Sequence, residues 1–157
     1  MKNKKSRFAK DKYLLLSELG SKLNLSFSSH LVLGNKLVAL DGIKRTLLIC
    51  DLYNELNPPH IILLNAVTTV SIKKIYSNIA PGEIQLKGVE EFLRTIDLQF
   101  EYSDNNEPGV LTFYDKETNA LQDIPMLERN AKNWQMILSK MVALQPNSIT
   151  EASKCYH

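Results

Sequence analysis

The order of its parts constrains the fold of this chain more than any single motif does. Six or seven short strand-like runs are followed by one amphipathic helix, which we expect at 125–144 and which carries the only tryptophan, Trp134. The helix has an apolar stripe at the 3.6-residue period, formed by Leu127, Ala131, Trp134, Leu138 and Met141. We therefore expect an α+β fold in which a strongly bent antiparallel sheet is closed by this C-terminal helix.

Turn residues divide the middle of the chain into short strands. We expect strands at 25–33, 36–40, 45–52, 60–64, 69–76, 96–102 and 110–114. Gly34-Asn35 and Asp41-Gly42 are hairpin signals, and short polar connections favour antiparallel neighbours. Residues 77–90 contain Pro81, Gly82 and Gly88, and we expect an irregular connection there.

The run from Ile96 to Tyr102 is the clearest strand, because apolar and polar residues alternate along it. Its apolar members are Ile96, Leu98, Phe100 and Tyr102, and its polar members are Asp97, Gln99 and Glu101. This period of two predicts one face in the core and one face in water.

A second helix is expected before the strands, at residues 10–23. One side of it gathers Leu15, Leu16, Leu19 and Leu23. We expect Gly20 to weaken its last turn or to end it. In the C-terminal helix we expect Trp134 to lie in the core and Met136, opposite the stripe, to be exposed.

The length of 157 residues predicts one domain, which we place at 10–145 between a basic arm at 1–9 and a tail at 146–157. The first twelve residues hold six basic residues and one acidic residue. Their net charge is +5 against +2 for the whole chain, which leaves −3 for the rest. A basic arm on a mildly acidic body is not a uniformly basic nucleic-acid surface, so specific nucleic-acid binding is not expected.

Cellular location is predicted from apolar runs and cysteines. No run approaches the roughly 18 residues that span a bilayer, and the basic start is not followed by a signal-peptide apolar region. Cys50 lies in an apolar strand and Cys155 in the polar tail, so a disulfide framework is not expected. We expect a cytoplasmic protein, with peripheral attachment to a membrane as an alternative.

No catalytic or metal-binding motif stands out. Ser28, Ser29 and His30 are neighbours, and Asp41 or Asp51 would be needed to complete a triad. However, no Gly-x-Ser-x-Gly motif is present, and adjacent strand residues point to opposite faces. The histidines at 30, 60 and 157 are scattered and no Cys-x-x-Cys pair occurs, so neither metal nor cofactor is expected. The chain is predicted not to be an enzyme, and a small hydrolase using His30 is the remote alternative.

Two basic features are candidate contact sites. The arm could contact an anionic membrane or another polyanion through Lys2, Lys4, Lys5 and Arg7. A ligand-binding site for an anion could form if two pairs converge at one open end of the strands, Lys44 with Arg45 and Lys73 with Lys74. The alternative in both cases is ordinary solvated charge.

The strands followed by the helix segment Glu128-Arg129-Asn130-Ala131-Lys132-Asn133-Trp134-Gln135-Met136-Ile137-Leu138 resemble the pleckstrin-homology-like (PH-like) superfamily. Residues 47–52 and then 61–70 look like the middle of its bacterial members, and the resemblance covers about 25–144. It implies two bent sheets in a half-open barrel with the helix plugging one end. Lipid-binding members use a basic pattern in the first hairpin, for which Lys36, Lys44 and Arg45 are the candidates. Leu47 stands where a further arginine is needed, which argues against specific phosphoinositide binding.

The resemblance implies binding to phosphoinositides, peptides or proteins rather than catalysis. We therefore predict a non-enzymatic intracellular binding module that docks an anionic or peptide partner at an open loop end or a sheet edge. A protein or peptide is the expected partner. Peripheral membrane attachment through the arm, and association into a homo-oligomer, are the alternatives.

Overall fold

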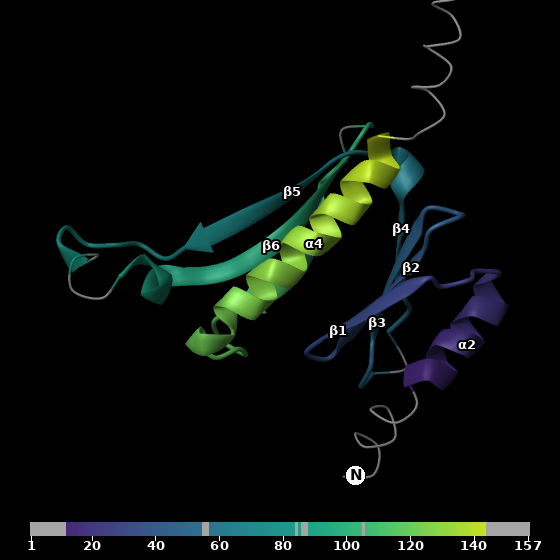
Figure 1. Ribbon diagram of the computed structural model, residues 1–157, viewed down its shortest axis with the longest axis horizontal. Coiled ribbons are helices and arrows are strands. Elements are labelled where there is room, and N and C mark those ends of the chain that lie inside the picture. Colours follow the sequence, from purple (N-terminus) through teal and green to yellow (C-terminus); the bar gives the residue numbers. More distant parts are fainter. Residues whose placement is uncertain (1–11, 55–56, 84, 86–87, 105, 144–157) are drawn as a thin grey trace, which may run out of the picture. The chain divides into compact units, whose positions relative to one another are not determined.

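The computed structural model describes residues 12–54, 57–83, 85, 88–104 and 106–143 (Figure 1). They form two compact units, unit 1 ending at Leu64 and unit 2 beginning at Asn65. The predicted α+β class is confirmed, with one helix before the strands and one after them. The strands form two antiparallel sheets, of four and three strands, and not a closed barrel. The expected domain at 10–145 stays a prediction, and the expected arm and tail lie outside the described residues.

Unit 1 is a helix followed by a four-stranded meander. Its elements are α2 (Lys12–Leu23), β1 (Ser29–Leu33), β2 (Lys36–Asp41), β3 (Thr46–Asp51) and β4 (His60–Leu63), and the sheet order is β1-β2-β3-β4. The first hairpin has the predicted two-residue turn, since Leu33 pairs with Lys36 and Gly34 has a φ of 60°. Glycine adopts this left-handed conformation without steric cost.

The second hairpin follows Asp41-Gly42 as predicted, and its loop is wider than a two-residue turn. Asp41 pairs with Thr46, so four residues form the loop, and the positive φ of 52° falls on Arg45. The reason is the Asp41 side chain, whose Oδ1 accepts the backbone N–H groups of Ile43 at 3.0 Å and Lys44 at 2.9 Å. An aspartate that bonds the backbone two and three residues ahead stabilises a wider turn.

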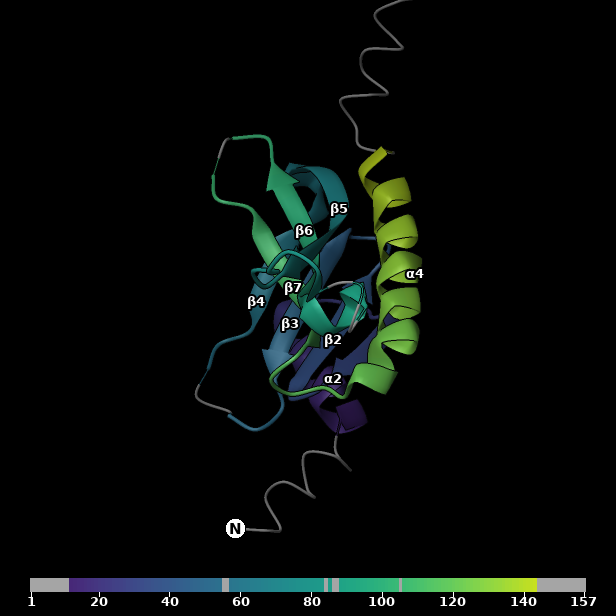
Figure 2. The same ribbon diagram turned by 90° about the vertical axis from the view of Figure 1, so that its left-hand side faces the viewer.

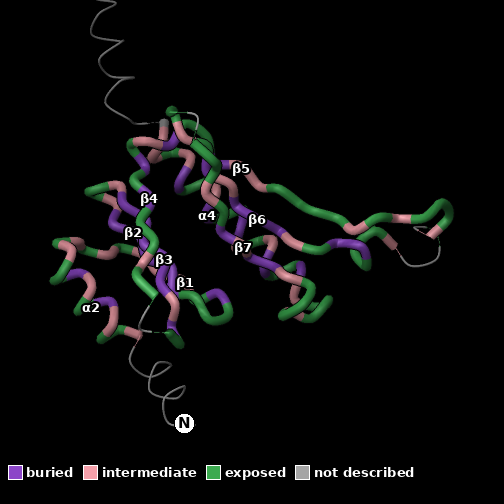
Figure 3. Tube along the Cα trace, turned by 180° about the vertical axis from the view of Figure 1, so that it is seen from behind, coloured by how far each residue is buried: buried purple, intermediate pink, exposed green. Residues whose placement is uncertain are grey.

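The core of unit 1 forms where α2 packs on one face of the sheet. Leu16 of α2 meets a buried cluster made of Leu37, Ala39, Leu48 and Cys50 on the strands and of Leu52, which directly follows β3. The central strands β2 and β3 are apolar on both faces, and their buried stretches are drawn in purple in Figure 3. Burial, and next the charge of Asp51, raise the pKa of the Cys50 thiol to about 11, so this thiol is neutral at physiological pH.

Unit 2 is a three-stranded sheet with a long helix on one face. Its strands are β5 (Val67–Tyr76), β6 (Leu93–Tyr102) and β7 (Gly109–Asp115), in the order β5-β6-β7, and its helix is α4 (Ile124–Ala143). Short 3₁₀ turns occur at Leu64–Ala66, Val89–Phe92 and Leu121–Asp123. Figures 1 and 2 show α4 running along the sheet, and it contacts all three strands.

The predicted apolar stripe is what α4 buries. Leu127, Ala131, Trp134 and Leu138 are buried, whereas Met136 is 54% exposed, as expected for the opposite side. A polar contact fixes the same helix, because the Gln135 side chain donates a hydrogen bond of 3.1 Å to the carbonyl of Val70 on β5. The expectation for Trp134 as a core residue is confirmed.

The alternation predicted for β6 is confirmed on its apolar side and wrong at one polar position. Ile96, Leu98 and Phe100 are fully buried, but Asp97, expected to face water, is only 8% exposed. Its carboxylate accepts the hydroxyls of Thr112 at 2.8 Å and Thr95 at 3.3 Å. These two hydrogen bonds replace water and make the burial of the carboxylate tolerable.

Truncating the core tryptophan tests this packing. Trp134→Ala should lower the free energy of unfolding by about 3 to 5 kcal/mol, because it removes a large buried side chain and leaves a cavity. Met136→Ala, on the exposed side of the same helix, should change it by no more than about 0.5 kcal/mol. Urea unfolding followed by circular dichroism measures both, and equal effects would contradict the packing.

Candidate functional site

A groove in unit 1 lies between α2 and the segment of residues 25–30, and it has a volume of about 570 Å³. Its lining is apolar at Leu16, Gly20, Leu25 and Phe27. Hydroxyl and imidazole groups complete the lining, from Tyr13, Ser17, Ser21, Ser26 and His30. The groove is shallow and open, and its lining combines apolar surface with a few polar groups, as the lining of ligand-binding surfaces does.

The end of α2 creates the groove by reversing the chain. The helix ends at Leu23, and Asn24 takes the left-handed conformation with a φ of 58°. The N–H of Leu25 then donates a hydrogen bond of 2.8 Å to the carbonyl of Gly20. This is the hydrogen bond of a Schellman motif, and it directs the following residues back along the helix.

Gly20 lies in the last turn of α2 and does not end the helix, so that alternative of the sequence expectation is wrong. A Cβ atom at this position would lie 2.8 Å from the carbonyl oxygen of Leu25. Real Cβ atoms do not approach backbone oxygen so closely, so a larger residue would push the segment away from α2. The glycine therefore permits the close approach that shapes one end of the groove.

A buried carboxylate holds the other wall. Asp41 is 1% exposed, and its Oδ2 accepts the N–H of Ser26 at 2.8 Å while its Oδ1 accepts those of Ile43 and Lys44. Burial alone would raise the pKa of this carboxyl, but the backbone donors of Lys44, Ser26 and Ile43, with the Lys44 charge, hold it below its usual value. Asp41 thus joins the wall of the groove to the β2–β3 turn.

The same contacts explain why β1 is shorter than predicted. Residues 25–28 were expected to be strand, yet β1 begins at Ser29. The amide of Ser26 bonds a side chain, and the amide of Ser28 bonds the Leu40 carbonyl at 2.8 Å. Ser29 already pairs with Leu40, so two residues, Ser28 and Ser29, lie opposite one residue of β2. This is the arrangement of a β-bulge, and regular pairing stops there.

Each end of the groove has a lysine beside it. At one end the Tyr13 and His30 rings meet edge to face at 5.3 Å, and the Lys12 ammonium lies 5.1 Å from the Tyr13 ring. At the other end the Lys44 ammonium donates a hydrogen bond to the carbonyl of Asn24, next to Leu25. No carboxylate is among the residues that line the groove.

The groove continues onto a free sheet edge. Among the residues that the structure describes, β1 pairs with β2 alone, and Leu33 and Lys36 close a two-residue turn, which makes them a hydrogen-bonded pair. Hydrogen-bonded and non-hydrogen-bonded pairs alternate along antiparallel strands. His30 and Val32 therefore belong to non-hydrogen-bonded pairs, and their N–H and C=O groups point away from β2. An incoming strand could bond these groups.

The four lysine and arginine residues expected to form an anion site fall in different units. Lys44 and Arg45 lie in the β2–β3 turn of unit 1, whereas Lys73 and Lys74 lie on β5 of unit 2. The carbonyl of Arg45 accepts the N–H of Leu64 at 2.9 Å. Lys73 is exposed and has no ion pair among the described residues. Convergence of the four stays a prediction.

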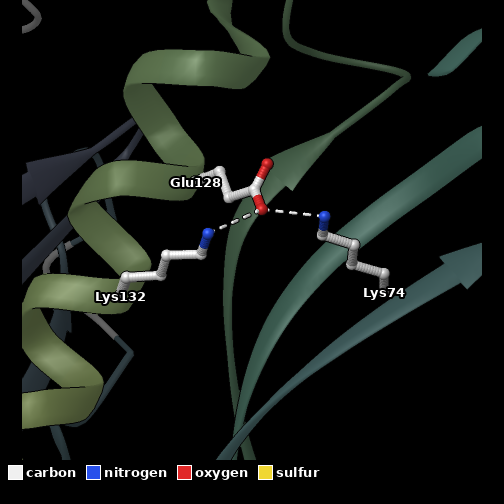
Figure 4. A network of polar contacts seen from close by, with 3 residues as sticks. All are labelled: Lys74, Glu128 and Lys132. Atoms are coloured by element: carbon white, nitrogen blue, oxygen red, sulfur yellow. Dashed lines mark ion pairs between the residues drawn. The ribbon is translucent and has the colours of Figure 1, made fainter.

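Lys74 has a partner within its own unit. Its ammonium lies 2.8 Å from the carboxylate of Glu128 on α4, which also meets Lys132 at 3.4 Å (Figure 4). The hydrogen bond to Glu128 raises the pKa of Lys74, and the same bond lowers the pKa of Glu128. Lys74 therefore joins the helix to the sheet. The arm residues Lys2, Lys4, Lys5 and Arg7 lie outside the described residues.

The contacts around His30 differ from those of a nucleophile triad. The Ser28 hydroxyl donates to the Leu40 carbonyl at 3.2 Å, and Asp41 accepts backbone amides. Asp51 accepts the N–H of Tyr53 and the side chain of Asn57. In the described part of the chain, none of these bonds joins a serine, a histidine and an acid in series.

Comparison with known proteins adds no assignment. No protein-family model, no curated protein and no solved structure matches this chain. Within the described ranges, no group of three potential metal-ligating side chains occurs. The helices described there include none that is long and apolar enough to cross a membrane. The groove is therefore assigned from its geometry.

Sequence reasoning missed the groove residues on α2, although a signal was present. Tyr13, Ser17, Gly20 and Ser21 recur at intervals of three and four, which places small and polar residues on one flank of the leucine stripe. We interpreted the helix only by its leucines. A flank of small residues beside an apolar stripe permits close approach of a second segment, which is the role it has here.

Adding one methyl group at Gly20 tests the shape of the groove. In an open helix Gly20→Ala would gain about 1 kcal/mol from helix propensity, but here the methyl group meets the Leu25 carbonyl. We expect a loss of about 1 to 3 kcal/mol in the free energy of unfolding instead. Ser21→Ala, at the exposed neighbouring position, is the control and should be neutral or stabilising. A stabilising Gly20→Ala would show that the close approach does not exist.

Replacing the buried carboxylate tests its part in holding the wall. Asp41→Asn should cost about 1 to 3 kcal/mol at pH 7, because the amide group puts an N–H₂ where Ser26 donates. The pKa of Asp41 is lower in the folded protein than in the unfolded chain, where it is about 3.9. The contribution of the ionised carboxylate to the free energy of unfolding is therefore complete above the unfolded pKa and is lost as the pH falls through the folded pKa.

The difference in the free energy of unfolding between the wild type and Asp41→Asn, the stability gap, should thus have its full size at pH 7 and become smaller below about pH 4. Urea unfolding at several pH values measures it. Glu107→Gln, at an exposed position, is the control and should show no such gap. A gap that stays constant down to pH 3 would contradict the assigned role.

Proposed function

We propose that this chain is a non-enzymatic binding module that docks an extended peptide segment of a partner protein in the groove of unit 1. The observation that carries this proposal is the position of the groove beside the free edge of β1. A peptide strand gains affinity from main-chain hydrogen bonds to such an edge and specificity from side chains that enter a neighbouring cleft.

The chemistry of the two surfaces supports an extended peptide over a compact small molecule. The outward N–H and C=O groups of His30 and Val32 offer the repeating donors and acceptors that a backbone satisfies. The groove then provides the apolar surface of Leu16 and Phe27 for alternate side chains, with serine hydroxyls beside it. A small ligand would use only one of these two surfaces.

Kinship with the PH-like superfamily belongs to the same proposal. It is supported by two antiparallel sheets followed by a C-terminal amphipathic helix that buries Trp134. Members of that superfamily bind peptides and proteins, which agrees with the docking groove. A cytoplasmic location is also proposed, and the buried free thiol of Cys50 agrees with it. Membrane attachment through the arm at 1–9 remains an alternative, and a small hydrolase remains the remote one.

Selection of ligands from a displayed library of random peptides tests the proposal. Peptides enriched on the full chain should lose at least about ten-fold in affinity with Ser21→Trp, because the indole fills the groove. Lys22→Trp adds the same bulk one residue away, outside the lining, and should leave the affinity unchanged. Fluorescence anisotropy measures both. No enrichment, or equal binding to the two variants, would contradict the proposal.

A further inference from the structure

We infer that the docked segment is acidic and carries two carboxylates about five residues apart, one meeting Lys12 and the other Lys44. This inference rests on the proposed function, because it specifies the chemistry of the peptide that the groove takes. Lys44 was expected to act with Arg45, Lys73 and Lys74. In the structure Lys44 and Lys12 instead lie beside opposite ends of one groove, next to Asn24 and Tyr13.

Charge complementarity is the first step of the argument. The Lys12 ammonium lies against the Tyr13 ring at one end, and Lys44 is exposed at the other end, where its ammonium contacts a neutral carbonyl. Neither of these contacts neutralises the positive charge. The lining between the ends has serine, tyrosine and histidine groups and no carboxylate. An anionic group near either end would gain an ion pair and displace no acid from the lining.

One acid of the protein does lie near the Lys44 end. Asp41 is buried beneath the turn and accepts three backbone N–H groups, so its carboxylate is satisfied before any ligand arrives. The Lys44 charge is one of the causes that lower the pKa of Asp41. The Lys44 side chain nonetheless reaches outward to Asn24, on the surface, where a ligand carboxylate could meet it.

The helix sets the spacing between the two carboxylates. Lys12 is the first residue of α2, and Lys44 contacts Asn24, the residue after the last, a rise of about 18 Å at 1.5 Å per residue. An extended peptide advances about 3.3 Å per residue, so about five residues cover this length. A segment with acids at both ends and β-branched residues between them fits the groove and reaches the edge of β1 at His30.

Three synthetic peptides provide the test on the full-length chain. The first is Glu-Thr-Val-Thr-Val-Glu, the second has glutamine in place of both acids, and the third has the same composition with its acids adjacent, Glu-Glu-Thr-Val-Thr-Val. Each exposed ion pair contributes about two- to five-fold in affinity. The first peptide should therefore bind more tightly than the other two, and added salt should reduce the difference.

Lysine variants identify the partners. Lys12→Gln and Lys44→Gln should each reduce the affinity for the first peptide by about two- to five-fold and leave the glutamine peptide unaffected. Lys22→Gln, on the same helix outside the lining, should change neither, and Lys44→Arg should keep the affinity. Thermal melts of each variant confirm folding. A double-mutant cycle against single-acid peptides assigns which acid meets which lysine.

The outcomes separate this inference from the proposed function. Equal binding of the first and second peptides, with both lost in Ser21→Trp, would overturn the acidic specificity and leave the peptide groove in place. Equal binding of the first and third peptides would overturn the spacing. Absence of binding by all three peptides, together with no peptide enriched from the random library, would overturn both proposals.

Discussion

The buried carboxylate of Asp41 is the interaction on which the rest of unit 1 depends. It accepts three backbone N–H groups, from Ser26 on one side and from Ile43 and Lys44 on the other. One side chain thereby sets the width of the β2–β3 turn, fixes the start of β1 at Ser29 and holds the segment that faces α2. Hydrogen bonds to an ionised group are the strong ones, so this arrangement offsets the cost of burying the charge.

Each unit contains a helix packed on an antiparallel sheet, and in each unit polar contacts fix how the packed segments lie. In unit 2 the stripe around Trp134 supplies the buried apolar area, while the Lys74–Glu128 pair and the Gln135 bond to Val70 orient α4 along β5. In unit 1 the helix leaves one flank open, because Gly20 brings residues 25–30 close without filling the space beside them. That open flank is what makes unit 1 the binding unit in our account.

Sequence reasoning predicted what depends on local periodicity and missed what depends on distant partners. The alternation in β6, the turn at Gly34 and the stripe of α4 follow from residue spacing alone. The burial of Asp97 depends on a hydroxyl of β7, and the pairing of Lys74 depends on α4, so neither can be inferred from neighbouring residues. The groove was missed because Gly20 was expected only to weaken or end the helix, whereas its role comes from its close approach to the carbonyl of Leu25.

Amide hydrogen exchange at the edge of β1 tests the central claim most directly. In the free protein the amides of His30 and Val32 point away from β2 and should exchange rapidly, whereas those of Leu31 and Leu33 should be protected. On binding a peptide ligand, the His30 and Val32 amides should become protected, because an added strand accepts their hydrogen bonds. Unchanged exchange at both amides, with new protection confined to unit 2, would contradict the account.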